Sequence, residues 1–121
     1  MTKIENSKQY DLEDRTLEFS KKVRSFIKLI PKTLSNLEDA KQLNKSSGSV
    51  GANYIEANEA LSKKDFIMRI KICRKEAKES NYWLNLIDTQ DNTILEAERK
   101  ILANEAKELT SIFGSILRKT E

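Results

Sequence analysis

The sequence predicts an all-α protein, an antiparallel four-helix bundle with up-down-up-down connections. Its 121 residues include only 3 Gly and 1 Pro, which is too little turn chemistry for an all-β fold. Charged residues of both signs make up 34% of the chain, as is typical of helices with solvated outer faces. Apolar residues also recur at intervals of three and four, the period of a buried helical face. We therefore expect one domain over residues 1–121 with a single core.

Composition also limits the classes of function. No stretch approaches the roughly 18 apolar residues of a membrane span, and MTKIENSKQY lacks the apolar segment of a signal peptide. A single cysteine, Cys73, agrees with a reducing compartment, so we expect a cytoplasmic protein with no membrane partner. The chain has no His, and neither a nucleophile–base pair nor a phosphate loop is visible. We expect no enzyme activity and no cofactor.

The first helix is expected to begin near Asp11 or Asp14 and to stop at Ile30, because Pro31 excludes helical geometry from the residue before it. Residues 1–11 are polar without periodicity and are expected to form a flexible arm. The apolar spacing predicts one buried face on this helix, made of Leu12, Phe19, Val23, Phe26, Ile27 and Ile30.

The second helix is expected to be capped by Ser35 or Asn36, to carry Glu38 or Asp39 in its first turn, and to end near Ala60. Small and apolar residues form two rows along its central part, which indicates contact on two sides. One row is Leu43, Ser47, Val50, Tyr54, Ala57 and Leu61, and the other is Gly48, Gly51, Ala52 and Ile55.

The second row contains two glycines, which are unfavourable in the interior of a helix. Each of Gly48 and Gly51 costs about 1 kcal/mol relative to Ala in a helix interior, so a neighbouring backbone is expected to pass close to them. A break or loop at the segment SSGSVG is the alternative.

The third helix is expected to start at Ser62 with Asp65 in its first turn, close to a capping box, and to lie antiparallel to the second. After a loop at residues 88–92, Thr93 and Glu96 are expected to cap the last helix. That helix ends in Arg118 and Lys119, which suit a helix C-terminus. The expected core stripe of the third helix is Phe66, Ile70, Cys73, Ala77, Ser80 and Leu84. The last helix contributes Ile94, Leu95, Ile101, Leu102, Leu109, Ile112, Phe113, Ile116 and Leu117.

Opposite the core stripe of the third helix lies a basic face. Between Lys63 and Lys78, seven basic residues stand against two acidic ones, a local excess of five positive charges. Such a face is either simply solvated or binds nucleic-acid phosphates, and we take it as the candidate nucleic-acid-binding site. Its outward-pointing residues are Lys64, Lys71, Lys75 and Lys78.

An apolar flank on the same helix is the candidate subunit contact, because a monomeric bundle would not need it. Its residues are Met68, Ile72, Trp83 and Leu86. Tyr82 and Trp83 are interpreted as core or interface anchors rather than as base-stacking residues.

Polar residues repeat one turn apart on the two central helices, Asn53 with Glu56 and Glu76 with Glu79. Their side chains could meet between the helices. A carboxylate cluster in a bundle resembles a di-iron site, but such sites also use Glu-x-x-His and this chain has no His. The favoured interpretation is polar pairing, either of Asn53 with Glu79 or of a Glu with Lys45 or Arg74.

A longer pattern runs through this region: Gln42, Leu43, Lys45, Ser46, Asn53, Glu56, Ser62, Asp65, Phe66, Glu76, Glu79, Tyr82 and Trp83. On these residues the chain resembles the four-helix-bundle family of 23S rRNA intervening-sequence proteins. Lys45 is a departure, since Arg is common there and Lys cannot make the bidentate contacts of a guanidinium. The resemblance implies a pentameric ring of bundles. It also implies a relation to the accessory subunit of retroelement reverse transcriptases, which binds nucleic acid.

The expected function is therefore that of a non-enzymatic homo-oligomer, a pentamer by resemblance, which binds RNA or DNA backbone through its basic face. A reverse transcriptase or another protein is a further expected partner. The alternative is a protein-interaction scaffold that binds no nucleic acid. Salt distinguishes the two, because only phosphate binding weakens steeply with ionic strength.

Overall fold

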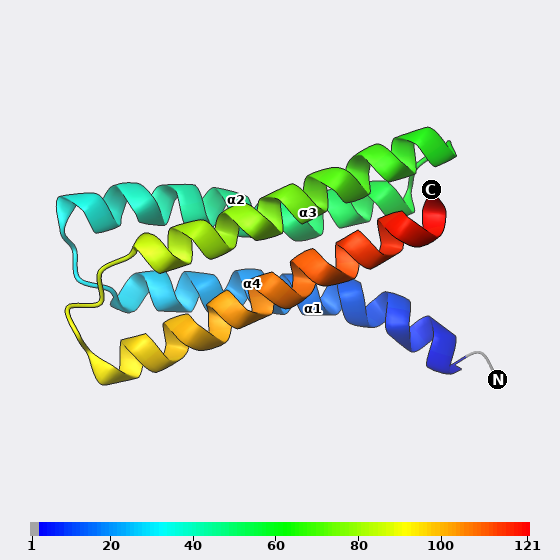
Figure 1. Ribbon diagram of the computed structural model, residues 1–121. Helices are drawn as coiled ribbons and strands as arrows, with labels where there is room; N and C mark the ends of the chain where they lie inside the picture. Colours follow the sequence, from blue (N-terminus) through cyan, green and yellow to red (C-terminus); the bar gives the residue numbers. More distant parts are fainter. Residues whose placement is uncertain (1–2) are drawn as a thin grey trace.

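The computed structural model describes the backbone of residues 3–121 and the side chains of residues 12–121. It contains four helices, α1 (Lys3–Leu29), α2 (Leu34–Asn58), α3 (Lys63–Leu86) and α4 (Thr93–Thr120), which confirms the all-α four-helix bundle. Figure 1 shows the α1–α2 and α3–α4 connections at one end of the bundle and the α2–α3 connection at the other. None of the helices over residues 3–121 combines the length and the apolar composition that a membrane span requires.

The helices pack as a four-sided bundle with one loose side. The α2–α3 and α3–α4 pairs contact each other most extensively, whereas α1 contacts α2 less and α4 least. Over residues 3–121, the backbones of the diagonal pairs α1–α3 and α2–α4 do not approach each other closely, but Tyr54 of α2 and Phe113 of α4 meet across the core with ring centroids 5.9 Å apart. The core between the helices is dominated by fully buried Phe19, Phe26 and Phe113. The α1–α4 side is therefore the place where the bundle is most open.

Helix α1 begins at Lys3, so the start expected near Asp11 or Asp14 was wrong. Residues 3–11 are helical in backbone, and only Met1 and Thr2 of the expected arm lie outside the described residues. The extension has a simple cause, because Lys, Glu and Gln are good helix formers and neither Gly nor Pro interrupts them. The helix ends at Leu29, before Ile30 and Pro31, for the predicted reason.

The start of α2 differs from the prediction because a residue nearer to Pro31 forms the cap. Thr33 accepts a hydrogen bond from the backbone N–H of Asn36 at 3.1 Å, so neither Ser35 nor Asn36 is the cap. Asn36 is buried instead. Its amide donates to the carbonyls of Pro31 (3.0 Å) and Asp88 (2.8 Å), and its Oδ1 accepts from Asp88 N–H at 2.9 Å. This one side chain ties together the two connections at that end of the bundle.

The glycine-containing segment of α2 is a continuous helix, so the loop alternative was wrong. A Cβ added at Gly51 would lie 2.8 Å from Oγ1 and 3.2 Å from Cβ of Thr16 on α1. At Gly48 the nearest atom would be Nη2 of Arg24, at 3.6 Å. Helix α1 therefore crosses α2 closely at Gly51, as predicted, whereas Gly48 faces only side chains, so the close backbone expected there was wrong.

The two predicted rows of α2 have different outcomes. Most of the first row is buried: Leu43, Ser47, Val50, Tyr54 and Ala57. Leu61 is 100% exposed, because α2 ends at Asn58 and Leu61 falls in the connection to α3. Ala52 and Ile55 of the second row are also exposed, since α1 contacts this side only around the glycines.

The start of α3 follows the prediction, and that of α4 does not. Ser62 Oγ accepts from Asp65 N–H at 3.1 Å. Helix α4 is capped by Asn92 rather than Thr93, through Oδ1 and the N–H of Leu95 at 3.0 Å. The cap lies one residue before the predicted one because the connection already turns at Gln90 and Asp91. These two residues adopt left-handed conformations, with φ of 55° and 59°.

The core stripe predicted for α4 was too wide. Leu95, Leu102, Leu109, Phe113 and Leu117 are buried, but Ile94 is 78% and Ile101 59% exposed. Ile101 lines the groove between α1 and α4, where the two helices contact each other least, so α1 does not cover it. The predicted core of α3 is correct, with Phe66 partly buried and the remaining members fully buried.

Candidate nucleic-acid interface

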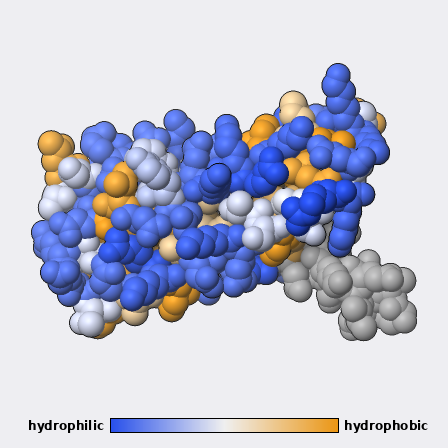
Figure 2. Space-filling model, viewed as in Figure 1, coloured by the Kyte–Doolittle hydropathy of each residue, from blue (hydrophilic) through white to orange (hydrophobic). Residues whose placement is uncertain are grey.

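The basic face of α3 is oriented by the core stripe on the opposite side of the same helix. Ile70, Cys73 and Ala77 are fully buried, and a helix that buries one side must turn the other outward. The four predicted residues, Lys64, Lys71, Lys75 and Lys78, are accordingly all exposed. Figure 2 shows a largely hydrophilic surface on the side that carries α3 and α4.

Three of these lysines line one groove. Lys71, Lys75 and Lys78 lie along the seam between α3 and α4, in an open groove of about 760 Å³. The other lining residues are Arg74 and Asn81 from α3, and Lys107, Thr110 and Ser111 from α4. We call this the α3–α4 groove.

Lys64 lies beyond the groove. It lines a shallow depression at the start of α3 with Ser62, Ile67 and Met68, and Lys71 borders both sites. Hydrophobic side chains gather over the first turns of α3 in Figure 2, so the groove has an apolar patch at one end. The predicted stripe is thus divided between two neighbouring surfaces.

The α3–α4 groove is strongly positive. Five of its eight lining residues are Lys or Arg, and none is acidic. Lys71 Nζ lies 3.6 Å from a Glu121 carboxylate oxygen, and Lys75 Nζ lies 3.7 Å from Glu76. Both lysines are more than half exposed, and such long exposed ion pairs are weak. The lysine charges are therefore available to an anionic ligand.

Several groove residues were missed by reasoning from sequence. Arg74 lies on the edge of α3 that faces α4, and Lys107 comes from α4 itself. Asn81 donates its amide to the carbonyl of Ala103 at 2.9 Å and so fixes where the two helices cross. The positive excess around Lys71 to Lys78 was visible in the sequence, but the α4 contribution depends on this crossing.

The expected meeting of Asn53, Glu56, Glu76 and Glu79 does not occur. Asn53 Oδ1 accepts from Nη1 of Arg69 at 3.0 Å, and the Asn53 amide donates to the carbonyl of Ser49 at 2.9 Å. Glu56 and Glu79 are exposed.

The cause is the register between α2 and α3. The hydroxyls of Ser46 and Ser80 are hydrogen-bonded at 2.9 Å in the buried seam, which places the Glu76 turn opposite Ser46. Asn53 lies further along α2, opposite Arg69. Of the other motif residues, Gln42 is exposed, whereas Asp65 and Phe66 form the start of α3. No group of acidic or sulfur ligands suited to a metal occurs within the described residues.

The apolar flank predicted as a subunit contact is only partly exposed. Met68 is 46% and Leu86 47% exposed, whereas Ile72 and Trp83 are half-buried. Trp83 packs against the core of its own chain. The neighbouring Tyr82 meets Trp83 edge to face, with ring centroids 5.0 Å apart and planes at 79°.

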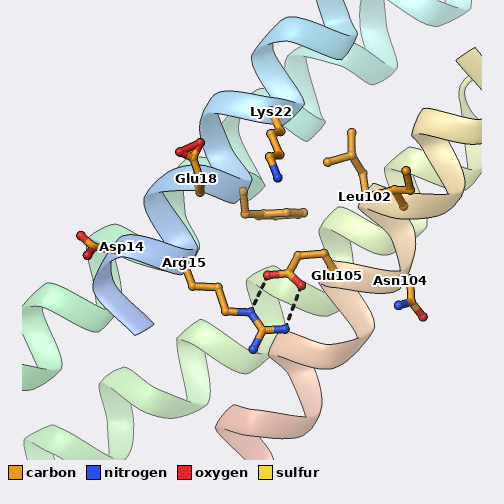
Figure 3. Close-up of a pocket in the computed structure, with 9 residues that line it drawn as sticks. Asp14, Arg15, Glu18, Lys22, Leu102, Asn104 and Glu105 are labelled. Atoms are coloured by element: carbon orange, nitrogen blue, oxygen red, sulfur yellow. Dashed lines mark hydrogen bonds and ion pairs between the residues drawn. The ribbon is translucent and has the colours of Figure 1, made fainter. Parts of the chain in front are cut away.

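A second groove lies on the loose α1–α4 side (Figure 3). There Arg15 and Glu105 point toward each other and form two hydrogen bonds, of 2.7 and 2.8 Å. This contact with Glu105 raises the pKa of Arg15 above its ordinary value. Asp14, Glu18 and Glu105 all line the groove, so it does not suit a phosphate.

Cys73, expected to be a small core residue, is fully buried. Burial raises the pKa of its thiol to about 12, so the thiol stays protonated at neutral pH.

Comparisons with known proteins agree with the fold. A family model described as 23S rRNA-intervening sequence protein matches residues 8–115. A crystal structure from Bacteroides thetaiotaomicron, described as a protein with unknown function from the S23 ribosomal protein family, is 31% identical in sequence. It superposes with a TM-score of 0.76, and the similarity covers 88% of this chain and 97% of that one. No curated protein matches the chain.

Proposed function

The chain belongs to the 23S rRNA-intervening sequence protein family, and on that premise we propose that it is a non-enzymatic protein that binds the phosphate backbone of RNA or DNA. The α3–α4 groove is the proposed site. The family membership suggests a setting close to RNA, and the site itself supports the chemistry.

One observation carries this proposal: Lys71, Arg74, Lys75, Lys78 and Lys107 line the groove without an acidic neighbour in its lining. A set of cations in one groove binds a polyanion because each phosphate contact releases condensed counterions. Lysines act as point charges, and no element among the described residues is shaped to read base edges in a duplex. Binding should therefore depend little on base sequence.

Assembly would strengthen such a site. The family resemblance suggests a pentameric ring, which would repeat the groove on every subunit. Linked weak sites can gain roughly 100-fold or more in avidity when geometry permits simultaneous contact. We propose such a ring as the functional form, in the cytoplasm, with nucleic acid as its ligand.

Replacing Lys71, Lys75 and Lys78 together by Gln tests the proposal. All three are exposed, so the fold should remain intact while binding of a mixed-sequence RNA or DNA weakens. The slope of log affinity against log salt should also become shallower by about two to three, because up to three phosphate contacts are lost. Fluorescence anisotropy titrations over a range of salt concentrations measure both effects.

A matched control replaces Lys21, Lys28 and Lys41 by Gln. These lysines are exposed on α1 and α2, outside the groove, and the change in net charge is the same. The control should bind almost as the wild type does. Equal losses in the two variants would show that net charge, not the groove, drives binding. Wild-type protein that fails to bind at about 50 mM salt, where phosphate contacts are strong, would contradict the proposal.

Exposed apolar side chains favour the alternative function, that of a protein-interaction scaffold. Leu29, Ile94 and Ile101 are exposed large apolar residues, and α1 and α4 carry them. Exposed apolar surface of this kind suits a protein partner, for example a reverse transcriptase. Binding through it would hardly change with salt, in contrast to binding in the groove.

A further inference from the structure

We propose that the α3–α4 groove takes single-stranded nucleic acid and that Tyr82 is the platform on which one of its bases stacks. The inference rests on the proposed function and names the class of ligand. It differs from the expectation that Tyr82 serves as a core or interface anchor.

Tyr82 continues the lysine stripe. On α3 the residues Lys71, Lys75, Lys78 and Tyr82 follow one another at intervals of four, three and four, which keeps them on one helical face. Tyr82 comes one turn after Lys78, so their side chains are neighbours, with Cβ atoms about 5–6 Å apart. From Lys71 to Tyr82 the stripe extends about 16 Å at 1.5 Å per residue. A short strand can thus contact the lysines and the ring together.

The two adjacent aromatic residues have different environments. Trp83 packs against the core, which accounts for its burial, whereas Tyr82 is 58% exposed and contributes nothing to the buried core. The edge-to-face contact with Trp83 covers at most one face of the Tyr82 ring. The Tyr82 ring is thus held on one side by Trp83 and keeps one face exposed beside a row of lysines. A site for base stacking requires this arrangement.

An exposed aromatic ring next to a row of lysines favours single-stranded nucleic acid over a duplex. Bases in a duplex are stacked on one another, so their faces are not accessible to a protein side chain. In a single strand the base can lie on Tyr82 while its backbone follows the lysines. Asn81 lines the groove next to Tyr82, and Thr110 and Ser111 line it from α4. These neutral groups can hydrogen-bond to sugar or phosphate oxygens without adding charge.

The test compares Tyr82→Ala and Tyr82→Phe with the wild type. The probes are mixed-sequence single-stranded RNA, single-stranded DNA and duplex DNA, each of about 12 nucleotides or base pairs, within the usual range of single-strand site sizes. Tyr82→Ala should weaken single-strand binding roughly 5- to 100-fold, the range found for loss of one stacked base. Tyr82→Phe keeps the ring and should bind within about twofold of wild type. Duplex binding should be the same in all three proteins.

Salt dependence separates stacking from charge. Tyr82→Ala should leave the salt slope unchanged, because no phosphate contact is lost, whereas the triple lysine variant changes it. The single tryptophan, Trp83, lies in contact with Tyr82, so its fluorescence should change when a single strand binds. A control variant, Leu61→Ala, removes a fully exposed apolar side chain elsewhere and should bind normally.

The possible failures are distinct. If the wild type binds single strands and Tyr82→Ala binds them equally well, the stacking inference is wrong and backbone binding stands. If Tyr82→Phe loses as much as Tyr82→Ala, the hydroxyl and not the ring is responsible, which also overturns stacking. If the wild type prefers duplex DNA, the ligand class is wrong. If it binds none of the probes, the proposed function itself fails.

Discussion

At the scale of single residues, Gly51 shows how a missing side chain can set a helix crossing. The space for its Cβ is already taken by Thr16, whose hydroxyl is held in place by donating to the carbonyl of Glu13 at 3.0 Å. The intrinsic cost of a mid-helix glycine is thus offset by the close approach of α1 that it permits.

Gly51→Leu should therefore destabilise the protein by about 1–3 kcal/mol through overpacking, although Leu is the better helix former. The matched control is Gly48→Ala, where the new Cβ would meet Arg24 at an ordinary contact distance of 3.6 Å. Gly48→Ala should be neutral or stabilise by up to about 1 kcal/mol. Denaturant unfolding followed by circular dichroism measures both. A Gly51→Leu variant as stable as the wild type would remove the close-crossing argument.

At the scale of elements, the two connections at one end of the bundle are fixed by side chains rather than by tight turns. Asn36 joins both connections, and Thr89 is buried beside them. Thr89 donates its hydroxyl to the Glu96 carboxylate, which also contacts Arg99. Arg99 in turn donates to the carbonyl of Ile87 at 2.7 Å. The start of α4 is thereby tied to the end of α3.

This network predicts a dependence of stability on pH. The hydrogen bond from Thr89, and then the charge of Arg99, hold the pKa of Glu96 below its ordinary value of 4.5. A carboxylate with a lowered folded-state pKa stabilises the protein above its unfolded-state pKa and loses that contribution as pH falls through the folded value. The contribution of Glu96 should thus be complete near neutral pH and disappear in acid, below about 4.5.

Glu96→Gln tests this contribution. The variant should be less stable than wild type at about pH 7, and the difference should shrink as the pH falls below 4.5 and through the lowered folded-state pKa of Glu96. Urea unfolding across that range measures the free energy of unfolding of both proteins. A control variant, Glu79→Gln, removes one exposed carboxylate from α3 and should show a much smaller difference at neutral pH. A Glu96→Gln difference that persists unchanged in acid would rule out the carboxylate as its source.

The α1–α4 side of the bundle is also held together by polar side chains. Helices α1 and α4 contact each other least, and Arg15 bridges them to Glu105 and, at 2.7 Å, to Glu108. This bidentate pair stands where apolar packing is sparse, and it is partly exposed, so its contribution to stability is modest.

At the scale of the whole molecule, the amount of exposed apolar surface argues for assembly. Several large apolar side chains are exposed on a bundle whose core is already filled, among them Met68 and Leu86 of the flank on α3. Such residues can be covered by another subunit, as expected for the candidate contact. The half-burial of Trp83 in its own chain leaves Met68 and Leu86 as the better probes of that contact.

We therefore expect an oligomer at tens of micromolar by light scattering, and a shift toward smaller species for the double variant Met68→Gln, Leu86→Gln. Leu61→Gln, at a fully exposed position in the α2–α3 connection, is the control and should leave the mass unchanged. A monomer mass for the wild type would contradict assembly. If the double variant keeps the mass of the wild-type oligomer, the subunit contact lies elsewhere, for example on the α1–α4 side.

Sequence alone was enough to predict the number and type of elements, the Ser62 cap, the close approach at Gly51 and the outward direction of the lysine face. These features depend on local chemistry or on the period of one helix, both of which a single sequence contains. It did not determine which helix faces which. The exposure of Ile94 and Ile101, the pairing of Asn53 with Arg69 and the place of Lys107 in the same groove as Lys78 depend on register and spacing between helices.

Those quantities are set by the packing of all four helices together, so they could be read only from the folded bundle. The same is true of Tyr82 and Trp83, which look alike in sequence. One turns to the core and the other to the lysines, because neighbouring residues on a helix point about 100° apart and only the packed bundle shows which direction is solvent.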